Sequence, residues 1–412
     1  MIYHLRSAGG GLPLLAWVVL GSLLAALLWP EAEVLGFKMT GWAWLCALMV
    51  ALPVLARGTR PAIRLPYGFW VPWMLVVVAN LFRYHANALQ ASLQIIAPIL
   101  VGMAASTYRP SERQLAWFIR LTKFCTVVFW GIVLYHIPML LYGKLPEATW
   151  LAMHAITAVL LATLYLALFL HGDRRALVFL AGCLAVPIVA LGRGAMLASV
   201  AVLASTFSRL SLLKRVLIIA AAAGLGLALF QMPTVQKKMF FSGAGTLSDI
   251  SADNRDFATS GRFTTLWPIM IAGIQQEPWL GHGANANAER LIQAGATMYL
   301  PHNDWLRIAY DYGIPLSLFL PLAILLQMLH AFHRSRRAGP NARVLFLAGA
   351  SAFIPFMLLM ITDNLIVYDQ FFGNVQFLWL GLAYGAGIDR GIHSHPGRAR
   401  SVTNSRSRLP AV

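Results

Sequence analysis

Charged residues are scarce in this sequence, and acidic residues are the scarcest of them. Only 11% of the 412 residues are charged and 59% are hydrophobic, and 15 acidic residues stand against 32 lysines and arginines. Soluble globular domains contain about 25% charged residues, so this composition excludes a soluble protein. The mean hydropathy of +0.68 indicates instead a membrane protein with many spans.

Cysteine is also nearly absent. The chain has three cysteines, Cys46, Cys125 and Cys183, and each lies inside an apolar run. A cysteine in such surroundings packs as a small apolar side chain, and the three positions lack the spacing of a zinc site. We therefore expect neither a disulfide nor a bound metal.

Long apolar runs are what the chain has in abundance. Each is about 20 residues long, which suffices to cross a hydrocarbon core, and together they predict an all-α polytopic membrane protein with about twelve transmembrane helices. Nine spans are expected within residues 1–231 and three within 314–389, separated by one large extramembrane loop at 232–313 and followed by a basic, disordered tail at 390–412. The predicted spans are 12–30, 36–56, 66–82, 88–106, 114–137, 149–171, 175–191, 194–208, 213–231, 314–333, 342–362 and 370–388.

The positions of lysine and arginine predict the orientation of these spans. Basic clusters such as Arg334, Arg336 and Arg337 occupy every second loop and the C-terminal tail, and positively charged loops stay in the cytoplasm. Both termini are therefore expected in the cytoplasm and the 232–313 loop on the periplasmic side of a bacterial inner membrane. The net charge of +17 follows from this topology and from contact with anionic membrane lipids, so we expect no nucleic acid partner. Arg83 and Arg193 break the rule, because they fall on the outer side.

The large loop contains signals for three short helices. Apolar residues recur at spacings of three and four from Phe263 to Ile274, which predicts a helix with a kink at Pro268. A second short helix is expected over 285–293. A third begins at an N-cap formed by Asn303 or Asp304 and ends at Gly313.

Motifs in and before this loop together resemble the O-antigen ligase and polymerase family. The resemblance covers residues 260–320 best, and it implies an all-helical, GT-C-like enzyme of the inner membrane. Such an enzyme takes a glycan from undecaprenyl diphosphate in the periplasm, without a metal, nucleotide or other cofactor, and passes it to an acceptor sugar. The motifs are Ser260-Gly261-Arg262 with Trp267, Pro278-Trp279-Leu280-Gly281-His282-Gly283, His302-Asn303-Asp304-Trp305-Leu306 ending at Gly313, and Leu191-Gly192-Arg193-Gly194-Ala195, where Gly192 replaces the usual Ser.

The chemistry of that transfer assigns roles to four residues. A diphosphate leaves the anomeric carbon without protonation, so the enzyme needs cations near its oxygens and a base for the acceptor hydroxyl. Arg193 and Arg262 are the main candidates for binding the diphosphate, because guanidinium groups bind phosphate bidentately, and Arg83 is a third. His302 is the candidate base, since imidazole titrates near neutral pH and a following helix N-terminus disfavours the imidazolium form. A single base predicts an inverting reaction.

Each of these residues also has a structural interpretation. His302 can cap the helix that follows it, Arg193 can anchor a helix end at the interface, and Arg262 can face lipid head groups. The other basic residues of the large loop are expected on a solvated or lipid-facing surface. They are Lys237, Lys238, Arg255, Arg290 and Arg307.

Within the family, the sequence favours a ligase that joins O-antigen to lipid A-core in lipopolysaccharide biosynthesis. Polymerases of the family often carry an Arg, ten residues and a Gly in each of two outer loops, and here the predicted outer loops contain that spacing once, from Arg262 to Gly273. An O-antigen polymerase and a protein O-oligosaccharyltransferase are alternatives with the same donor chemistry. A lipid-linked glycan transporter is an alternative of another class. The chain lacks two similar halves, and few ionisable residues, mainly His136 and His154, fall inside its predicted spans.

Overall fold

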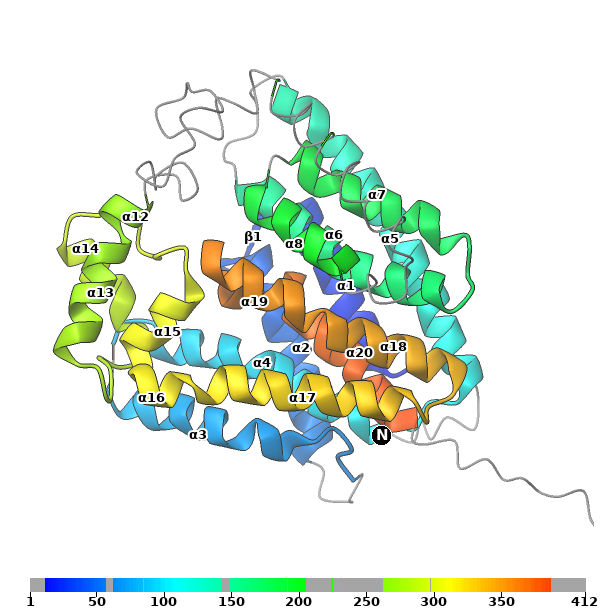
Figure 1. The fold of residues 1–412 in the computed structure, drawn as a ribbon, viewed down its shortest axis with the longest axis horizontal. Helices are drawn as coiled ribbons and strands as arrows, with labels where there is room; N and C mark the ends of the chain where they lie inside the picture. The colour runs from blue at the N-terminus through cyan, green and yellow to red at the C-terminus, as the bar shows by residue number, and fades with distance from the viewer. Residues whose placement is uncertain are drawn as a thin grey trace, which may run out of the picture.

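The computed structural model is helical almost throughout the residues that it describes (Figure 1). Those residues are 12–56, 62–83, 85–141, 149–190, 192–204, 262–296 and 298–386, with the single positions 224 and 231. The one sheet within these ranges is a short antiparallel hairpin of β1 (Glu33–Val34) and β2 (Phe37–Lys38). The prediction of an all-α membrane protein is confirmed in this respect.

The N-terminal helices follow the predicted apolar runs. Every predicted span up to 194–208 contains a described helix, whereas the span at 213–231 and the tail at 390–412 lie outside the described ranges apart from positions 224 and 231. The helices are α1 (Leu14–Leu28), α2 (Met39–Ala56), α3 (Val71–Ala79) between the 3₁₀ turns η1 (Tyr67–Phe69) and η2 (Asn80–Phe82), α4 (Ala88–Thr107), α5 (Glu112–Leu141), α6 (Thr149–Leu170), α7 (Ala176–Val189) and α8 (Arg193–Ala204).

The C-terminal helices also follow their runs, but breaks at Leu318 and Ala352 divide two of them. The predicted span 342–362 is divided at Ala352 into α18 (Pro340–Ser351) and α19 (Phe353–Thr362). The remaining elements are α16 (Ile314–Ser317), α17 (Phe319–Ser335), η5 (Leu365–Phe371) and α20 (Gly373–Ala386). In the described residues six helical stretches are long and apolar enough to cross a membrane, and four further apolar helices are shorter.

Small residues allow α20 to pack closely against α4. A Cβ at Gly381 would collide with the carbonyl oxygen of Gly102, and a Cβ at Gly385 would collide with that of Tyr108. These two glycines are four residues apart and therefore lie on one face of α20. Close backbone approach through small residues is typical of helices that pack inside a membrane.

The described part of the large loop, residues 262–313, forms a separate helical layer that we call the loop module. It contains α12 (Arg262–Thr265), α13 (Trp267–Gln276), α14 (Ala286–Gln293) and α15 (Asp304–Tyr312), gathered beside the ends of the membrane helices (Figure 1). Its own apolar core includes Met270, Leu291 and Tyr310. On the other side, Tyr312 of α15 packs against Trp73 of α3, with ring centroids 5.2 Å apart, so α15 joins the loop module to the membrane helices.

Most local predictions for the loop module are confirmed. Asn303 is the N-cap of α15, because its side-chain oxygen accepts a hydrogen bond from the Leu306 amide at 3.0 Å, and Gly313 ends the helix with φ 80°. Pro268 does not kink a continuous helix. It occupies the first turn of α13, where its missing amide costs nothing, and the break between α12 and α13 falls at Leu266.

Candidate functional site

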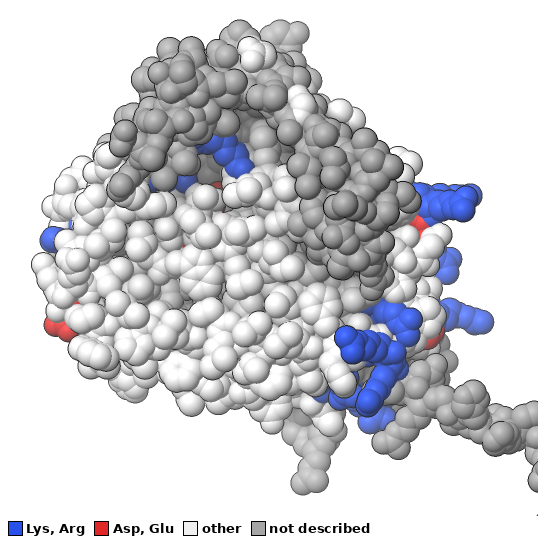
Figure 2. Space-filling model, viewed as in Figure 1, with Lys and Arg blue, Asp and Glu red and all other residues white. Residues whose placement is uncertain are grey.

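Four segments that are distant in sequence meet at one end of the membrane helices. Gly194 at the start of α8 lies against Thr362 at the end of α19, where a Cβ would collide with the threonine hydroxyl. The carbonyl of Thr362 accepts a hydrogen bond from Arg262 Nη1 at the start of α12. The next residue, Asp363, faces His302, which precedes α15. Figure 2 shows lysine or arginine side chains within a hollow in the part of the molecule where Figure 1 places α8, α12 and α19.

His302 and Asp363 form a pair at this site. Nδ1 of His302 lies 3.4 Å from Oδ1 of Asp363, at the long end of hydrogen-bond range, and the two side chains are 21% and 23% exposed. The same carboxylate oxygen accepts from the Asn364 amide at 2.9 Å. A carboxylate that faces Nδ1 favours a proton on that nitrogen and leaves the lone pair on Nε2. His302 itself has φ 51°, so its backbone turns immediately before the N-cap of α15.

The two arginines predicted to bind diphosphate lie close to each other. Arg193 and Arg262 are near enough to repel electrostatically. Burial lowers the pKa of Arg262, and the neighbouring Asp363 and Tyr368 raise it in part. Arginine stays charged under such conditions, so two partly buried guanidinium groups share the site with the carboxylate of Asp363. An anion carrying more than one charge would relieve their repulsion.

Arg83 lies elsewhere. Its Nη1 donates to the carbonyl of Gly281, and Gly281 packs on the backbone of Asp311 and Gly313. Arg83 is therefore at the C-terminal end of α15, about 12 Å along the helix axis from the end that His302 precedes, at 1.5 Å per residue. The structure brings Arg193, Arg262 and His302 together. Arg83 lies in the α3–α4 connection and contacts a turn of the loop module.

The residues after Arg83 hold the loop module to the α3–α4 connection. His85 Nδ1 lies 2.9 Å from Glu289 Oε2, and its Nε2 lies 2.9 Å from the carbonyl oxygen of His282. Burial would lower the pKa of His85, but the bonds to Glu289 and His282 raise it overall. Because both ring nitrogens face oxygen acceptors, the ring must carry two protons to satisfy both. Asn285 completes the attachment by donating to the Ala86 carbonyl.

Arg307 corrects one expectation from the sequence. The sequence predicts a solvated or lipid-facing position for it. Its side chain is instead only 3% exposed and lies between Asp304 at 3.7 Å and Asp311 at 4.0 Å. Burial raises the pKa of Asp304 to about 7 and that of Asp311 to about 6, against the lowering effect of Arg307. The spacing of three and four residues between these charges is the helical signal that could have revealed the cluster.

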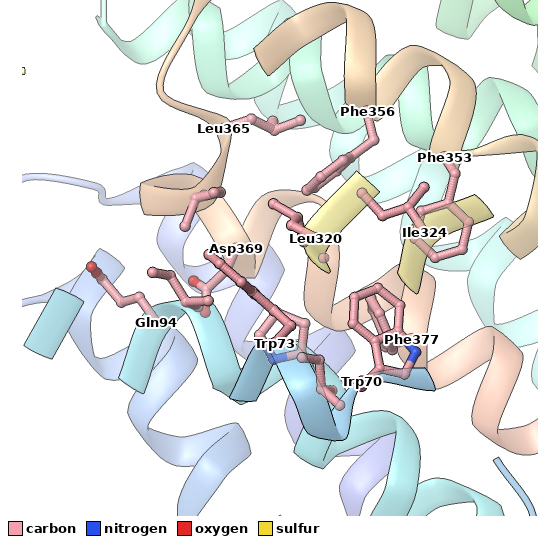
Figure 3. A pocket seen from close by; sticks show the side chains of 15 residues that line it. Trp70, Trp73, Gln94, Leu320, Ile324, Phe353, Phe356, Leu365, Asp369 and Phe377 are labelled. Atoms are coloured by element: carbon pink, nitrogen blue, oxygen red, sulfur yellow. The ribbon is translucent and has the colours of Figure 1, made fainter. Parts of the chain in front are cut away.

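A mainly apolar cavity lies between α3, α4, α17, α19 and α20. Figure 3 shows Asp369 and Gln94 toward one end and Phe353 and Phe377 toward the other. The carboxyl oxygens of Asp369 have no hydrogen-bond partner among the described residues. Asp369 therefore adds a buried ionisable residue to the two histidines that the sequence indicated. Sequence patterning placed it in a short outer loop and gave no sign of its burial.

Comparison with known proteins supports the resemblance drawn from the motifs. Residues 176–321 match the family model described as O-antigen ligase, and this segment includes Arg193, Arg262 and His302. No curated protein matches the chain. The matched segment runs from α7 through the loop module into α17, and so contains three of the four segments that meet at the site. The chain is thus a membrane protein whose residues 176–321 match the O-antigen ligase family model.

Proposed function

We propose that the protein is an inverting, metal-independent glycosyltransferase. It transfers O-antigen glycan from undecaprenyl diphosphate to lipid A-core at the periplasmic face of the bacterial inner membrane. Members of the matched family are O-antigen ligases of glycosyltransferase type. The observation that carries the proposal is the meeting of the His302–Asp363 pair with two partly buried arginines in the same site.

The arginines act on the donor. Arg193 and Arg262 approach from the starts of α8 and α12, so they can bind the diphosphate from two sides. Charge-assisted, bidentate bonds from guanidinium to phosphate oxygens are strong, and they stabilise the negative charge that develops as the bond from the anomeric carbon to the diphosphate breaks. The diphosphate needs no proton to leave, which agrees with a site that offers guanidinium groups on that side.

His302 acts on the acceptor. Its Nε2 takes the proton of the acceptor hydroxyl while that oxygen bonds to the anomeric carbon, and the carbon–diphosphate bond breaks on the opposite side. The configuration at the anomeric carbon therefore inverts. Asp363 keeps the proton of the neutral ring on Nδ1 and stabilises the imidazolium that forms, as a carboxylate does for other catalytic histidines. Asp363 was not among the residues that the sequence selected.

The acceptor distinguishes the ligase from its alternatives. The spacing from Arg262 to Gly273, which occurs once in the predicted outer loops, favours the ligase. In this chain Gly273 has a packing role, because a Cβ there would collide with the ring of Tyr310. The motif thus couples the helix after Arg262 to the helix after His302. A polymerase or a protein O-oligosaccharyltransferase would use the same donor site and a different acceptor.

The test compares His302→Ala with the wild-type protein and with His333→Ala. His333 is an exposed histidine at the end of α17 and serves as a matched control. We expect His302→Ala to bind undecaprenyl-diphosphate glycan normally and to lose about 10²- to 10⁴-fold in turnover, the usual contribution of a general base, while His333→Ala stays like the wild type. Turnover by His302→Ala at the wild-type rate rejects the base role.

The same assay separates the alternatives. Lipid A-core, free glycan and protein acceptors are offered side by side to the purified wild-type enzyme with one donor. Product on lipid A-core alone supports the ligase, whereas product on glycan or protein supports the polymerase or the oligosaccharyltransferase. Translocation of the donor in vesicles without transfer to any acceptor would identify a transporter.

A further inference from the structure

The two members of the His302–Asp363 pair belong to segments that are 61 residues apart in the chain. Their own contact is long, at 3.4 Å, and does not fix their separation. A shorter bond joins the same two segments. Oδ2 of Asp304, two residues after His302, accepts a hydrogen bond at 2.8 Å from the amide of Ile366, three residues after Asp363.

Asp304 is fully buried at this junction. Its side chain is 0% exposed, and its Oδ1 has no hydrogen-bond partner among the described residues. The start of η5 is therefore held by one carboxylate oxygen of α15, Oδ2. Arg307 lies 3.7 Å away on the same helix and offsets the cost of burying the charge.

We propose that Asp304 is a positioning residue that sets the distance and orientation of Asp363 relative to His302. The inference rests on the proposed function, because it concerns the pair that activates the acceptor. Asp304 does not touch the substrate. It holds the start of η5 against the start of α15, so that the carboxylate of Asp363 stays in front of Nδ1 of His302.

A carboxylate is needed for this task and an amide does not replace it. Both oxygens of an aspartate accept hydrogen bonds, whereas asparagine offers one oxygen and an NH₂ group that only donates. In Asp304→Asn the oxygen can face either the Ile366 amide or Arg307, and the NH₂ group would then face the other, which is also a donor. The segment that carries Asp363 is then held less tightly. A misplacement of about 1 Å in a catalytic group lowers turnover by up to about 100-fold.

Asp311 provides a matched control on the same helix. Its side chain is 1% exposed and shares Arg307 with Asp304. Its carboxylate accepts from the amides of Asn285 and Asn287 and from the side chain of Asn287, all at the α14 side of the loop module. In either Asp→Asn variant, Arg307 keeps one aspartate partner. Asp311→Asn therefore disturbs the same buried charges without touching the Ile366 amide of η5.

The experiment measures donor affinity, turnover and thermal stability of the full-length wild-type, Asp304→Asn and Asp311→Asn proteins in detergent. We expect Asp304→Asn to lose about 10- to 100-fold in kcat with unchanged affinity for undecaprenyl-diphosphate glycan, and Asp311→Asn to keep the wild-type kcat. Both melting temperatures should fall by similar amounts, because each variant loses a buried carboxylate beside Arg307.

Two results would overturn the proposal. One is an equal loss of kcat in both variants, which would mean that Asp304 contributes only to stability. The other is a wild-type kcat in Asp304→Asn. If the wild-type protein itself transfers no glycan, the proposed function fails instead. Active wild-type enzyme with a fully active Asp304→Asn variant rejects the positioning role alone.

Discussion

The two ends of α15 use the same residue types for different purposes. At the N-terminal end a buried aspartate, Asp304, binds the backbone of η5 beside the His302–Asp363 pair. At the C-terminal end a buried aspartate, Asp311, binds the backbone of α14. The first end lies beside Asp363, which neighbours the partly buried Arg262, and the second faces the turn that Arg83 holds. Residue type alone therefore does not identify the site. The segment that each carboxylate contacts decides its role.

Substitution of the arginines tests most directly whether the two ends of α15 have different roles. We expect Arg193→Ala and Arg262→Ala each to lower donor use by about 10- to 100-fold, because one charge-assisted hydrogen bond to phosphate contributes about 1.5–3 kcal/mol. Arg83→Ala should leave donor use near the wild-type level and lower the stability of the loop module, because its guanidinium bonds to Gly281. Donor titration with the purified variants measures the first effect, and thermal unfolding measures the second.

Lysine variants sharpen this prediction. Arg193→Lys and Arg262→Lys keep the charge but lose the bidentate fork, so they should recover only part of the donor affinity. If Arg83→Ala weakens donor binding as strongly as Arg262→Ala, the separation of the two ends is wrong. The diphosphate site would then have to extend along α15.

The free energy of unfolding of a Gly313 variant tests the packing at the C-terminal end of α15. Its φ is 80° and ψ is 158°, a region of backbone conformation that is nearly exclusive to glycine and costs other residues about 1–3 kcal/mol. A Cβ at this position would also collide with the carbonyl of Trp279. Gly313→Ala should therefore lower the free energy of unfolding of the loop module by more than Gly295→Ala. The control, Gly295, has φ 72° and open space around its Cβ position. Hydrogen exchange of residues 262–313 measures both, and equal losses would show that the contact with Trp279 adds nothing.

The sequence predicted the local features of this site better than the contacts between its segments. The cap at Asn303 and the end at Gly313 follow from residue types and short spacings. The roles of Asp363 and Arg83 depend on contacts with residues 61 and 198 positions away, which hydropathy does not encode. The prediction of a surface position for Arg307 is wrong for a related reason. A single arginine in a loop indicates an exposed side chain unless its two aspartate partners, Asp304 and Asp311, are recognised on the same helix face.

The pH dependence of stability is the smallest expected effect, and it acts on both ends of α15. The pKa of His85 is raised above its ordinary value of 6.5, so its contribution is complete below about pH 6.5 and is lost as the pH rises through the higher folded-state pKa. Asp304 and Asp311, with pKa values raised to about 7 and about 6, bind their protons more tightly when folded. They therefore also make the folded state less stable as the pH rises from about 4 to 7.

All three groups predict that the loop module is more stable at pH 5.5 than at pH 8. Glu289, whose pKa is lowered by its bonds to His85 and Ala86, acts in the opposite sense only below its ordinary pKa of 4.5, outside this window. His85→Gln should make the pH dependence shallower by no more than about 1 kcal/mol, because the pair with Glu289 is partly exposed and screened by solvent. Thermal unfolding at the two pH values measures the difference. Equal pH dependence in the wild-type and His85→Gln proteins would assign the whole effect to the aspartates of α15.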